Sequence, residues 1–418
     1  MVAGGLYLKE AYDESQSGEQ DNDAAVAIGG LRLQLVDLGG KENRFLIDAR
    51  TESDFFGQVD KENLQLTQSS TFTLKTVVYQ RPPSGKGLFY SLGRFPVRDA
   101  GVFANDGGLV GSKITRRLAI SAFAGQFPSD IASRYRTPAS PLTQVGATVA
   151  YQKSSSDWKS FTNISNSVVQ APNRDPFAED SRNYLFHSSA LQFDLNNRLT
   201  NILYYDFAPE AKLSYWVGNF YHRFNRNLIG NVGIINYDTS NYLLVNEQQN
   251  GLDASSYQAY RADISNNFTK TFKLQLNYRN GTRAADNLKD DLVGVKMFFS
   301  RLPTRKFLLT VGGGQRNNFV YKSTFVGSGL HYFSQVYEVS LEYERDQRAY
   351  DDQNKNANIA RGSVHYYLSE KLHGSLTFQG VSGDDIDLNY AMFTIGYRIG
   401  NQEFSPIRNK APVRENVN

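Results

Sequence analysis

The feature that most constrains this chain is an alternation of apolar and polar residues that recurs along most of its 418 residues. Residues 272–279 read Phe-Lys-Leu-Gln-Leu-Asn-Tyr-Arg, with every even position apolar and every odd position polar. Residues 337–344 read Tyr-Glu-Val-Ser-Leu-Glu-Tyr-Glu, with three carboxylates on one face. Successive side chains of a β-strand point to opposite faces, so the pattern predicts strands with one apolar face and one polar face.

The lengths of these runs and of their connections decide between sheet architectures. Nearly every run has roughly 9 to 13 residues, enough for a tilted strand to cross a bilayer. Short connections are expected at residues 39–43, 115–117, 154–157, 196–198, 225–227, 269–270, 302–305, 334–335 and 369–371, and longer polar segments at 126–141, 171–180, 239–254, 346–356 and 382–385. Short turns on one side and longer loops on the other are typical of bacterial transmembrane barrels, whose apolar face meets lipid and whose polar face lines a lumen.

We therefore predict an all-β fold, namely a transmembrane antiparallel up-and-down β-barrel of about 22 strands. The runs 6–12 and 109–114 are the weakest, so roughly 18 or 20 strands would also fit, and the number should be even. Residues 1–23 are expected to form an N-terminal segment with an acidic loop and a candidate first strand. Residues 24–400 are expected to form the barrel, and residues 401–418 a periplasmic C-terminal tail.

Composition favours a barrel over a helical membrane protein. The mean hydropathy is −0.47, and no run approaches the roughly 18 consecutive apolar residues that a spanning helix needs. The 27 Phe and 25 Tyr suit aromatic girdles at the two membrane interfaces. The absence of Cys excludes thiol catalysis, disulfides and thiolate metal sites. The net charge of +3 implies no nucleic-acid partner.

These features resemble those of outer-membrane porin-like barrels as a class, over nearly the whole chain. The resemblance implies a location in a bacterial outer membrane, with contacts to its lipids and lipopolysaccharide. Such a protein needs a secretion signal, which the start Met-Val-Ala-Gly-Gly does not provide, so we interpret the sequence as a mature one. One departure is that barrels of this class usually end on an aromatic residue, whereas here the last run, 388–399, is followed by the tail.

The alternation assigns each side chain to lipid or to lumen. The lipid face is predicted to carry Leu31, Leu33, Leu35, Phe45, Ile47, Leu274, Leu276, Val293, Val295, Met297, Phe299, Leu309, Val311, Val339, Leu341, Leu376, Phe378, Phe393 and Ile395. The pore-lining residues are predicted to be Arg44, Asp48, Arg50, Lys75, Arg94, Arg261, Asp263, Lys273, Arg279, Lys296, Glu338, Glu342, Glu344, Arg361 and His365. An acidic column on one strand beside basic residues on the next could orient polar solutes across the lumen, or could brace the wall as interstrand ion pairs.

Patterns that could carry chemistry are weaker. The five His lie on separate runs without metal-ligand spacing, so no metal site is expected. His187-Ser188-Ser189 invites comparison with a barrel esterase, which needs a His-activated Ser. His187 cannot activate Ser188, because adjacent strand residues point to opposite faces; Ser189 shares the face of His187, but no third member or oxyanion donor is indicated. We therefore expect no enzymatic activity and no cofactor. Gly312-Gly313-Gly314 is interpreted as a kink or close packing in a strand.

Two kinds of connecting segment stand apart. Acidic clusters at 13–23, 346–352 and 384–387 could bind Ca²⁺ or bridge to lipopolysaccharide through divalent ions, although solvated loops are the simpler interpretation because no calcium-loop spacing is present. Residues 95–108 form a long and weakly polar segment that includes Val102, Phe103 and Ala104. This segment is expected either to fold into the barrel and narrow it or to pack on the rim as a surface loop.

The function predicted from these features is a channel for passive diffusion of small polar solutes, because barrels of about 16 or more strands leave an aqueous interior unless something fills it. No plug domain fits before the first clear run at residue 24. The alternative is a non-enzymatic barrel that serves as a membrane anchor or export conduit within a larger envelope complex. In that case the tail, with Arg408, Lys410 and Arg414, would bind a periplasmic or envelope protein.

Overall fold

The computed structural model describes residues 2–12, 21–36, 38, 42–54, 70–83, 87–128, 143–155, 160–172, 181–208, 211–238, 256–284, 287–302, 304–318, 321–350, 353–369, 372–384 and 387–397. Within these residues it contains the strands β1 (Val2–Tyr12), β2 (Asp21–Leu35), β3 (Arg44–Asp54), β4 (Ser70–Arg81), β5 (Gly87–Val97), β6 (Val102–Lys113), β7 (Leu118–Gln126), β8 (Thr143–Ser154), β9 (Phe161–Pro172), β10 (Ser181–Gln192), β11 (Asn197–Ala208), β12 (Lys212–Arg223), β13 (Leu228–Asp238), β14 (Ser256–Asn267), β15 (Phe272–Arg283), β16 (Lys289–Ser300), β17 (Phe307–Asn317), β18 (Lys322–Phe333), β19 (Tyr337–Ala349), β20 (Asn354–Tyr367), β21 (Leu372–Gly383) and β22 (Asp387–Tyr397). A short 3₁₀ helix, η2 (Arg98–Ala100), separates β5 from β6.

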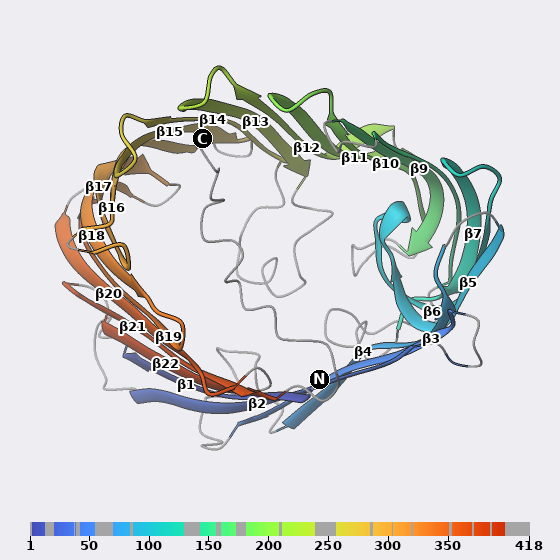
Figure 1. Cartoon of the computed structure of the whole chain (residues 1–418), viewed down its shortest axis with the longest axis horizontal. Coiled ribbons are helices and arrows are strands. Elements are labelled where there is room, and N and C mark those ends of the chain that lie inside the picture. Colours follow the sequence, from blue (N-terminus) through green and yellow to red (C-terminus); the bar gives the residue numbers. More distant parts are fainter. Residues whose placement is uncertain are drawn as a thin grey trace.

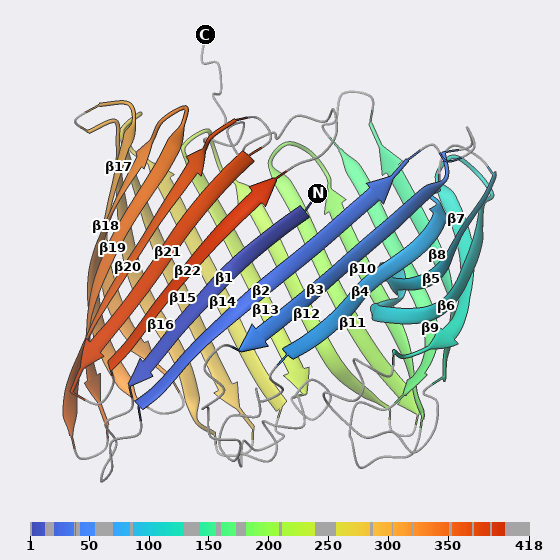
Figure 2. The ribbon, with the colours of Figure 1, turned by 90° about the horizontal axis from the view of Figure 1, so that it is seen from below.

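The strands form one closed antiparallel sheet. Each strand pairs with its neighbours in the chain, and β1 also pairs with β22, from Val2 opposite Tyr397 to Tyr12 opposite Asp387. Viewed along the axis, the strands form a ring (Figure 1), and viewed from the side they are tilted (Figure 2). The predicted fold, an all-β up-and-down barrel with an even number of strands, is confirmed. No helix in the described part of the chain is long and apolar enough to span a membrane.

The two faces of the wall differ as the alternation predicts. Leu276 is 48% exposed and lies opposite Ile264 and Val295, which are also exposed. The same outer face carries the exposed side chains of Leu33, Leu35, Val293, Val295, Leu341, Leu376, Phe378, Phe393 and Ile395, so these assignments to the lipid face are confirmed. The other lipid-face assignments fall on half-buried positions of the same parity, except Leu31, whose side chain lies outside the described part. The barrel therefore presents a broad apolar belt outward.

Short connections join consecutive strands at one rim of the barrel, the rim at which β1 begins and β22 ends (Figure 2). The strand bounds place them at 36–43, 82–86, 114–117, 155–160, 193–196, 224–227, 268–271, 301–306, 334–336 and 368–371. They agree with the predicted short connections, although the turn after β10 starts three residues earlier than expected.

These turns form where the sequence places a small polar acceptor just after a strand. Oγ1 of Thr115 accepts from the backbone N–H of Leu118 (2.9 Å), and Oδ1 of Asn225 accepts from that of Leu228 (2.8 Å). Asp194 accepts from the side chain of Asn197 and from two backbone N–H groups, and these hydrogen bonds hold the pKa of its carboxyl below the usual range.

The connections at the opposite rim are of mixed length: by the strand bounds 127–142, 173–180 and 239–255 are long, whereas 209–211, 318–321 and 384–386 are as short as the turns of the first rim. The expectation of a longer segment at 382–385 is therefore wrong, because β21 continues to Gly383 and β22 begins at Asp387. The expectation of a long polar loop at 346–356 is wrong, because β19 continues to Ala349 and β20 begins at Asn354. In β19 the inward-facing positions continue through Glu344, Asp346 and Arg348. The prediction interpreted these polar residues as a loop, although they alternate as strand residues do. The acidic segment 13–20 and the tail 401–418 lie outside the described residues.

The hairpin made by β5, η2 and β6 leaves the wall and folds into the barrel (Figure 1). β4 pairs with β5 only from Val77 opposite Arg94 to Arg81 opposite Tyr90, and β6 stops pairing with β7 beyond Asp106. Gly93 lies where β5 separates, with a positive φ of 114°, and a Cβ there would lie 2.2 Å from the carbonyl oxygen of Val77. Only glycine fits this close approach.

The tip of this hairpin packs on the inner face of β8 to β11. Ser167 Oγ and Tyr204 OH donate to the carbonyls of Asp99 (2.6 Å) and Gly101 (3.1 Å). The apolar cluster beneath it comprises Val78, Phe95, Val97, Ala100, Val102, Phe123, Val169, Tyr184 and Phe186. Of the two expectations for residues 95–108, folding into the barrel is the one that the structure bears out, although most of the segment is strand and not loop.

Candidate pore wall

The inner face of β13 to β20 forms a recess of about 370 Å³, lined by both charged and apolar side chains, on the side of the barrel away from the infolded hairpin. The pairing of the strands identifies this face as the inner one. Phe186 and Tyr204 contact the hairpin inside the barrel, and residues paired across neighbouring strands point to the same side of the sheet. Following these pairs from Tyr204 to β14 places Arg261 on that same inner side. Seven of the predicted pore-lining residues line the recess, namely Arg261, Asp263, Arg279, Lys296, Glu342, Glu344 and Arg361. The structure thus brings together charges from five strands, β14 to β16 and β19 to β20.

The remaining predicted residues are spread more widely. Lys273, Glu338 and His365 share the inner parity of the recess but lie outside it. Arg44 and Asp48 are on the inner parity of β3, on another sector of the wall.

Three predicted residues do not fit the simple alternation or cannot be placed by it. Lys75 sits in a β-bulge between Leu74 and Thr76, so alternation does not fix its direction. Arg94 lies at the base of the hairpin, where its guanidinium binds Asp106 (2.6 Å) and the carbonyl of Leu74 (2.9 Å). The side chain of Arg50 lies outside the described part of the chain.

Some charges on this wall are bound by other side chains. Arg279 pairs with Asp290 (2.5 Å), and Glu344 pairs with Arg316 (3.0 Å). Asn277 donates to Asp263 (2.6 Å).

Other charges on this wall have no permanently charged partner of opposite sign among the described residues. Glu342 faces Arg361 in register, yet Arg361 donates to Gln379 (3.1 Å), and Glu342 lies 3.6 Å from His331. Lys273 and Lys296 flank the ring of Phe298, at 5.2 and 5.6 Å from its centroid. Within the described residues, no carboxylate pairs with Lys273, Lys296 or Arg361, so their charges face the lumen.

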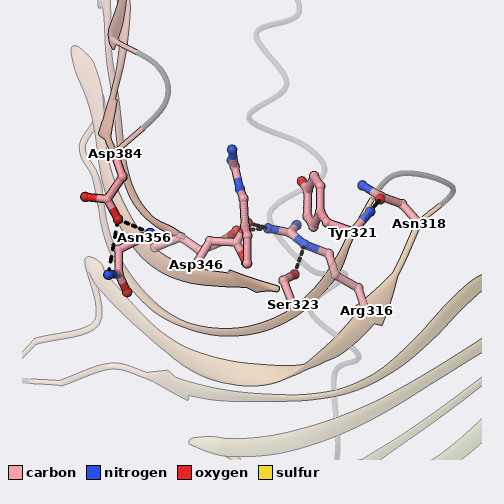
Figure 3. Close-up of polar contacts among 9 residues, drawn as sticks. Arg316, Asn318, Tyr321, Ser323, Asp346, Asn356 and Asp384 are labelled. Atoms are coloured by element: carbon pink, nitrogen blue, oxygen red, sulfur yellow. Dashed lines mark hydrogen bonds and ion pairs between the residues drawn. The ribbon is translucent and has the colours of Figure 1, made fainter. Parts of the chain in front are cut away.

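Between the recess and the rim that carries the connection from β19 to β20, Asp346 is fully buried and contacts two arginines (Figure 3). Its Oδ2 accepts from Arg316 (2.5 Å) and Arg348 (3.1 Å), and Arg316 also donates to Ser323 (3.0 Å). Sequence reasoning missed this network because it assigned Asp346 to a loop. The signal was the continued alternation at 344, 346 and 348. Such a network braces the wall, which is the second of the two interpretations offered for the charged columns.

A second buried pair was also missed. Arg182 on β10 and Asp206 on β11 form a bidentate ion pair beside the hairpin, each only 5% exposed, with one N–O distance of 2.7 Å. Arg182 also donates to Ser214 Oγ on β12 (2.6 Å) and covers the ring of Tyr184. This contact can be predicted only if the register of three neighbouring strands is known, and the sequence alone does not give that register.

No protein-family model matches the chain, and no curated protein matches it. Among solved structures it is similar to the P pilus usher (PapC) translocation pore, with 10% identity and a TM-score of 0.49, over 96% of this chain and 100% of that one. It is also similar to Pseudomonas aeruginosa OccK9 (OpdG), with 8% identity and a TM-score of 0.47, over 95% and 97% of the two chains. Acinetobacter baumannii OccAB4 follows with 9% identity and a TM-score of 0.44, over 95% and 96%. Likeness at this level says nothing of what the barrel transports.

Proposed function

We propose that this protein is a channel of the bacterial outer membrane through which small polar solutes diffuse passively. The observation that carries the proposal is the inner wall of β13 to β20, where charges of both signs surround one recess. Charged side chains that face a barrel interior are hydrated only if that interior holds water. The apolar belt on the outer face supports a place in a membrane, and a barrel of this size leaves room for an aqueous passage.

The lumen would not be a uniform pore. The infolded hairpin occupies one side of the ring (Figure 1), and the recess is lined by β13 to β20 on the other side. Solutes would therefore pass between the infolded hairpin, whose tip exposes Arg98 and Asp99, and a wall that carries charges of both signs. Lys273, Lys296 and Arg361 supply positive potential, and Glu338 and Glu342 supply negative potential from the adjacent strands. Such a lining favours small, polar or charged solutes over apolar ones.

Charge neutralisation on this wall tests the proposal. We expect the double variant Lys273→Gln/Lys296→Gln to shift the reversal potential in a salt gradient towards cation selectivity, and Glu338→Gln/Glu342→Gln to shift it towards anion selectivity. Each permeability ratio should change by a factor of about 2 or more, since the surface potential of such a site is a few kT. Both shifts should shrink in concentrated salt, because the screening length falls from about 10 Å at 0.1 M to about 3 Å at 1 M.

Arg345 provides the matched control, because it lies on β19 with the outward parity, opposite Val326 and Asn358. Arg345→Gln should leave the reversal potential unchanged. Unchanged selectivity in both double variants, with conductance retained, would mean that these charges only brace the wall.

The alternative, an anchor or export conduit in an envelope complex, predicts a barrel that stays closed to ions when purified alone. A periplasmic or envelope partner for the tail belongs to that alternative, whereas contacts with outer-membrane lipids and lipopolysaccharide are proposed for the barrel in either role. Both roles, the channel and the alternative, are non-enzymatic roles of the barrel and its lumen.

A further inference from the structure

A polar cluster interrupts the apolar outer face of β9 to β11. His187 on β10 lies opposite Asn166 on β9, and its Nδ1 is 2.8 Å from Oδ1 of Asn166. Its Nε2 is 3.2 Å from Oγ of Ser189, two residues further along the same strand. The amide oxygen of Asn166 can only accept, so Nδ1 of His187 carries the proton. The lone pair of Nε2 is then free to accept the proton of the Ser189 hydroxyl.

This cluster faces away from the lumen. Phe186, adjacent to His187, lies beneath the infolded hairpin, whereas Leu185 pairs with Val168, which is 55% exposed on the outer face. Polar groups that face lipid are costly, and an ionisable side chain within the spanning region is expected to have a function. The lumen channel does not use these residues, so their arrangement needs a separate explanation.

A fourth side chain completes the arrangement. Asn201 on β11 lies directly opposite Ser189, and its Oδ1 accepts a hydrogen bond from Nε1 of Trp216 on β12 (2.6 Å). This bond fixes which end of the amide points towards β12. Among the described residues, the NH₂ group of Asn201 donates to none, so beside Ser189 it can donate to an external oxygen.

We propose that Ser189, His187 and Asn166 form a nucleophile, a general base and a positioning residue that hydrolyse the ester of a membrane lipid, with Asn201 donating to the oxyanion. Ser189 Oγ attacks the acyl carbonyl while Nε2 of His187 takes its proton, which then passes to the departing alcohol as the ester C–O bond breaks. Water, deprotonated by the same nitrogen, attacks the acyl-serine, releases the fatty acid and restores Ser189. No oxidant, metal or cofactor enters the balance.

The surroundings indicate a lipid as the substrate. Val149 and Val168, which are 49% and 55% exposed, lie beside Asn166 on the outer face, and Leu185 and Leu203 lie beside His187. An acyl chain could lie along this apolar surface with its ester at Ser189, whereas a soluble ester would have no comparable contact. The site stands on the opposite side of the wall from the lumen, so it goes beyond the proposed channel function.

The test uses the full chain, folded in detergent and in vesicles. A long-chain alkyl fluorophosphonate should modify Ser189, seen as a mass shift of the peptide that contains it. Phosphatidylethanolamine vesicles with a fluorescent acyl chain should release fatty acid. Ser189→Ala and His187→Gln should abolish the adduct and lower hydrolysis at least about 100-fold. Asn201→Ala should lower hydrolysis by about 100-fold, mainly in kcat.

Ser188→Ala is the matched control, because Ser188 is adjacent in sequence and on the opposite face; this variant should keep both the adduct and the hydrolysis. Asn166 acts through His187, so Asn166→Ala should lower kcat while Asn166→Asp restores it. Folding of every variant is checked by its electrophoretic mobility before and after heating. No adduct at Ser189 in the folded wild type, or hydrolysis that survives Ser189→Ala, overturns the triad. An adduct without fatty-acid release overturns the assignment of lipid ester as substrate.

Discussion

Leu276→Arg is expected to prevent most of the protein from assembling in a membrane. Leu276 lies in the outer apolar belt, 48% exposed, with Ile264 and Val295 as its cross-strand neighbours. A guanidinium on that face at mid-depth costs about 2–4 kcal/mol, which is a large part of the stability of a typical domain. The fraction of folded barrel after refolding into vesicles, read from its heat-dependent electrophoretic mobility, measures the effect.

Gln275→Arg is the control, one residue away and on the inner face. Its new charge would be hydrated in the lumen, and the repulsion from Lys296 opposite should cost less than about 1 kcal/mol. We expect near-normal assembly for this variant. Equal tolerance, or equal failure, of the two variants would contradict the assignment of faces on β15.

Arg182→Met should produce the largest loss of stability among changes to the inner wall. The substitution keeps the volume but leaves the carboxylate of Asp206, 5% exposed, without its ion-pair partner. Breaking one side of a buried pair lowers the free energy of unfolding by about 3–5 kcal/mol. Denaturant unfolding in micelles should show this as a lower midpoint with a similar slope.

Arg226→Met serves for comparison, because Arg226 is exposed in the turn between β12 and β13. Its effect should stay within about 0.5 kcal/mol. A loss for Arg182→Met no larger than that would mean that the pair contributes nothing beyond what hydrophobic packing replaces.

The barrel and its two faces could be predicted from the sequence because both depend on local alternation. Leu276 and Gln275 point to opposite faces because they are adjacent residues of one strand. The turn at Asn225 was similarly predictable, since its side chain caps the turn within three residues. Such features need no knowledge of which strands become neighbours.

The contacts across strands could not be predicted in this way. Asp346 was assigned to a loop because the polar run 344–348 obscured its alternation, and its burial depends on Arg316 from two strands earlier. The apolar residues of the segment 95–108 indicated that it avoids water. Its contacts with Tyr184 and Tyr204 depend on strands that are about a hundred residues away in the sequence.

The same limit explains the outer-face cluster. Alternation placed Ser189 on the face of His187, but the partner that orients His187 is on the preceding strand. Asn166 becomes visible only when the register of β9 and β10 is known.

Single-channel conductance of the purified protein in a planar bilayer tests the central claim most directly. If the charges on the inner wall of β13 to β20 border an aqueous passage, the protein should give steady openings on the nanosiemens scale that scale with salt concentration. A correctly folded barrel that stays silent at every salt concentration would contradict a passive channel and favour the anchor or export role.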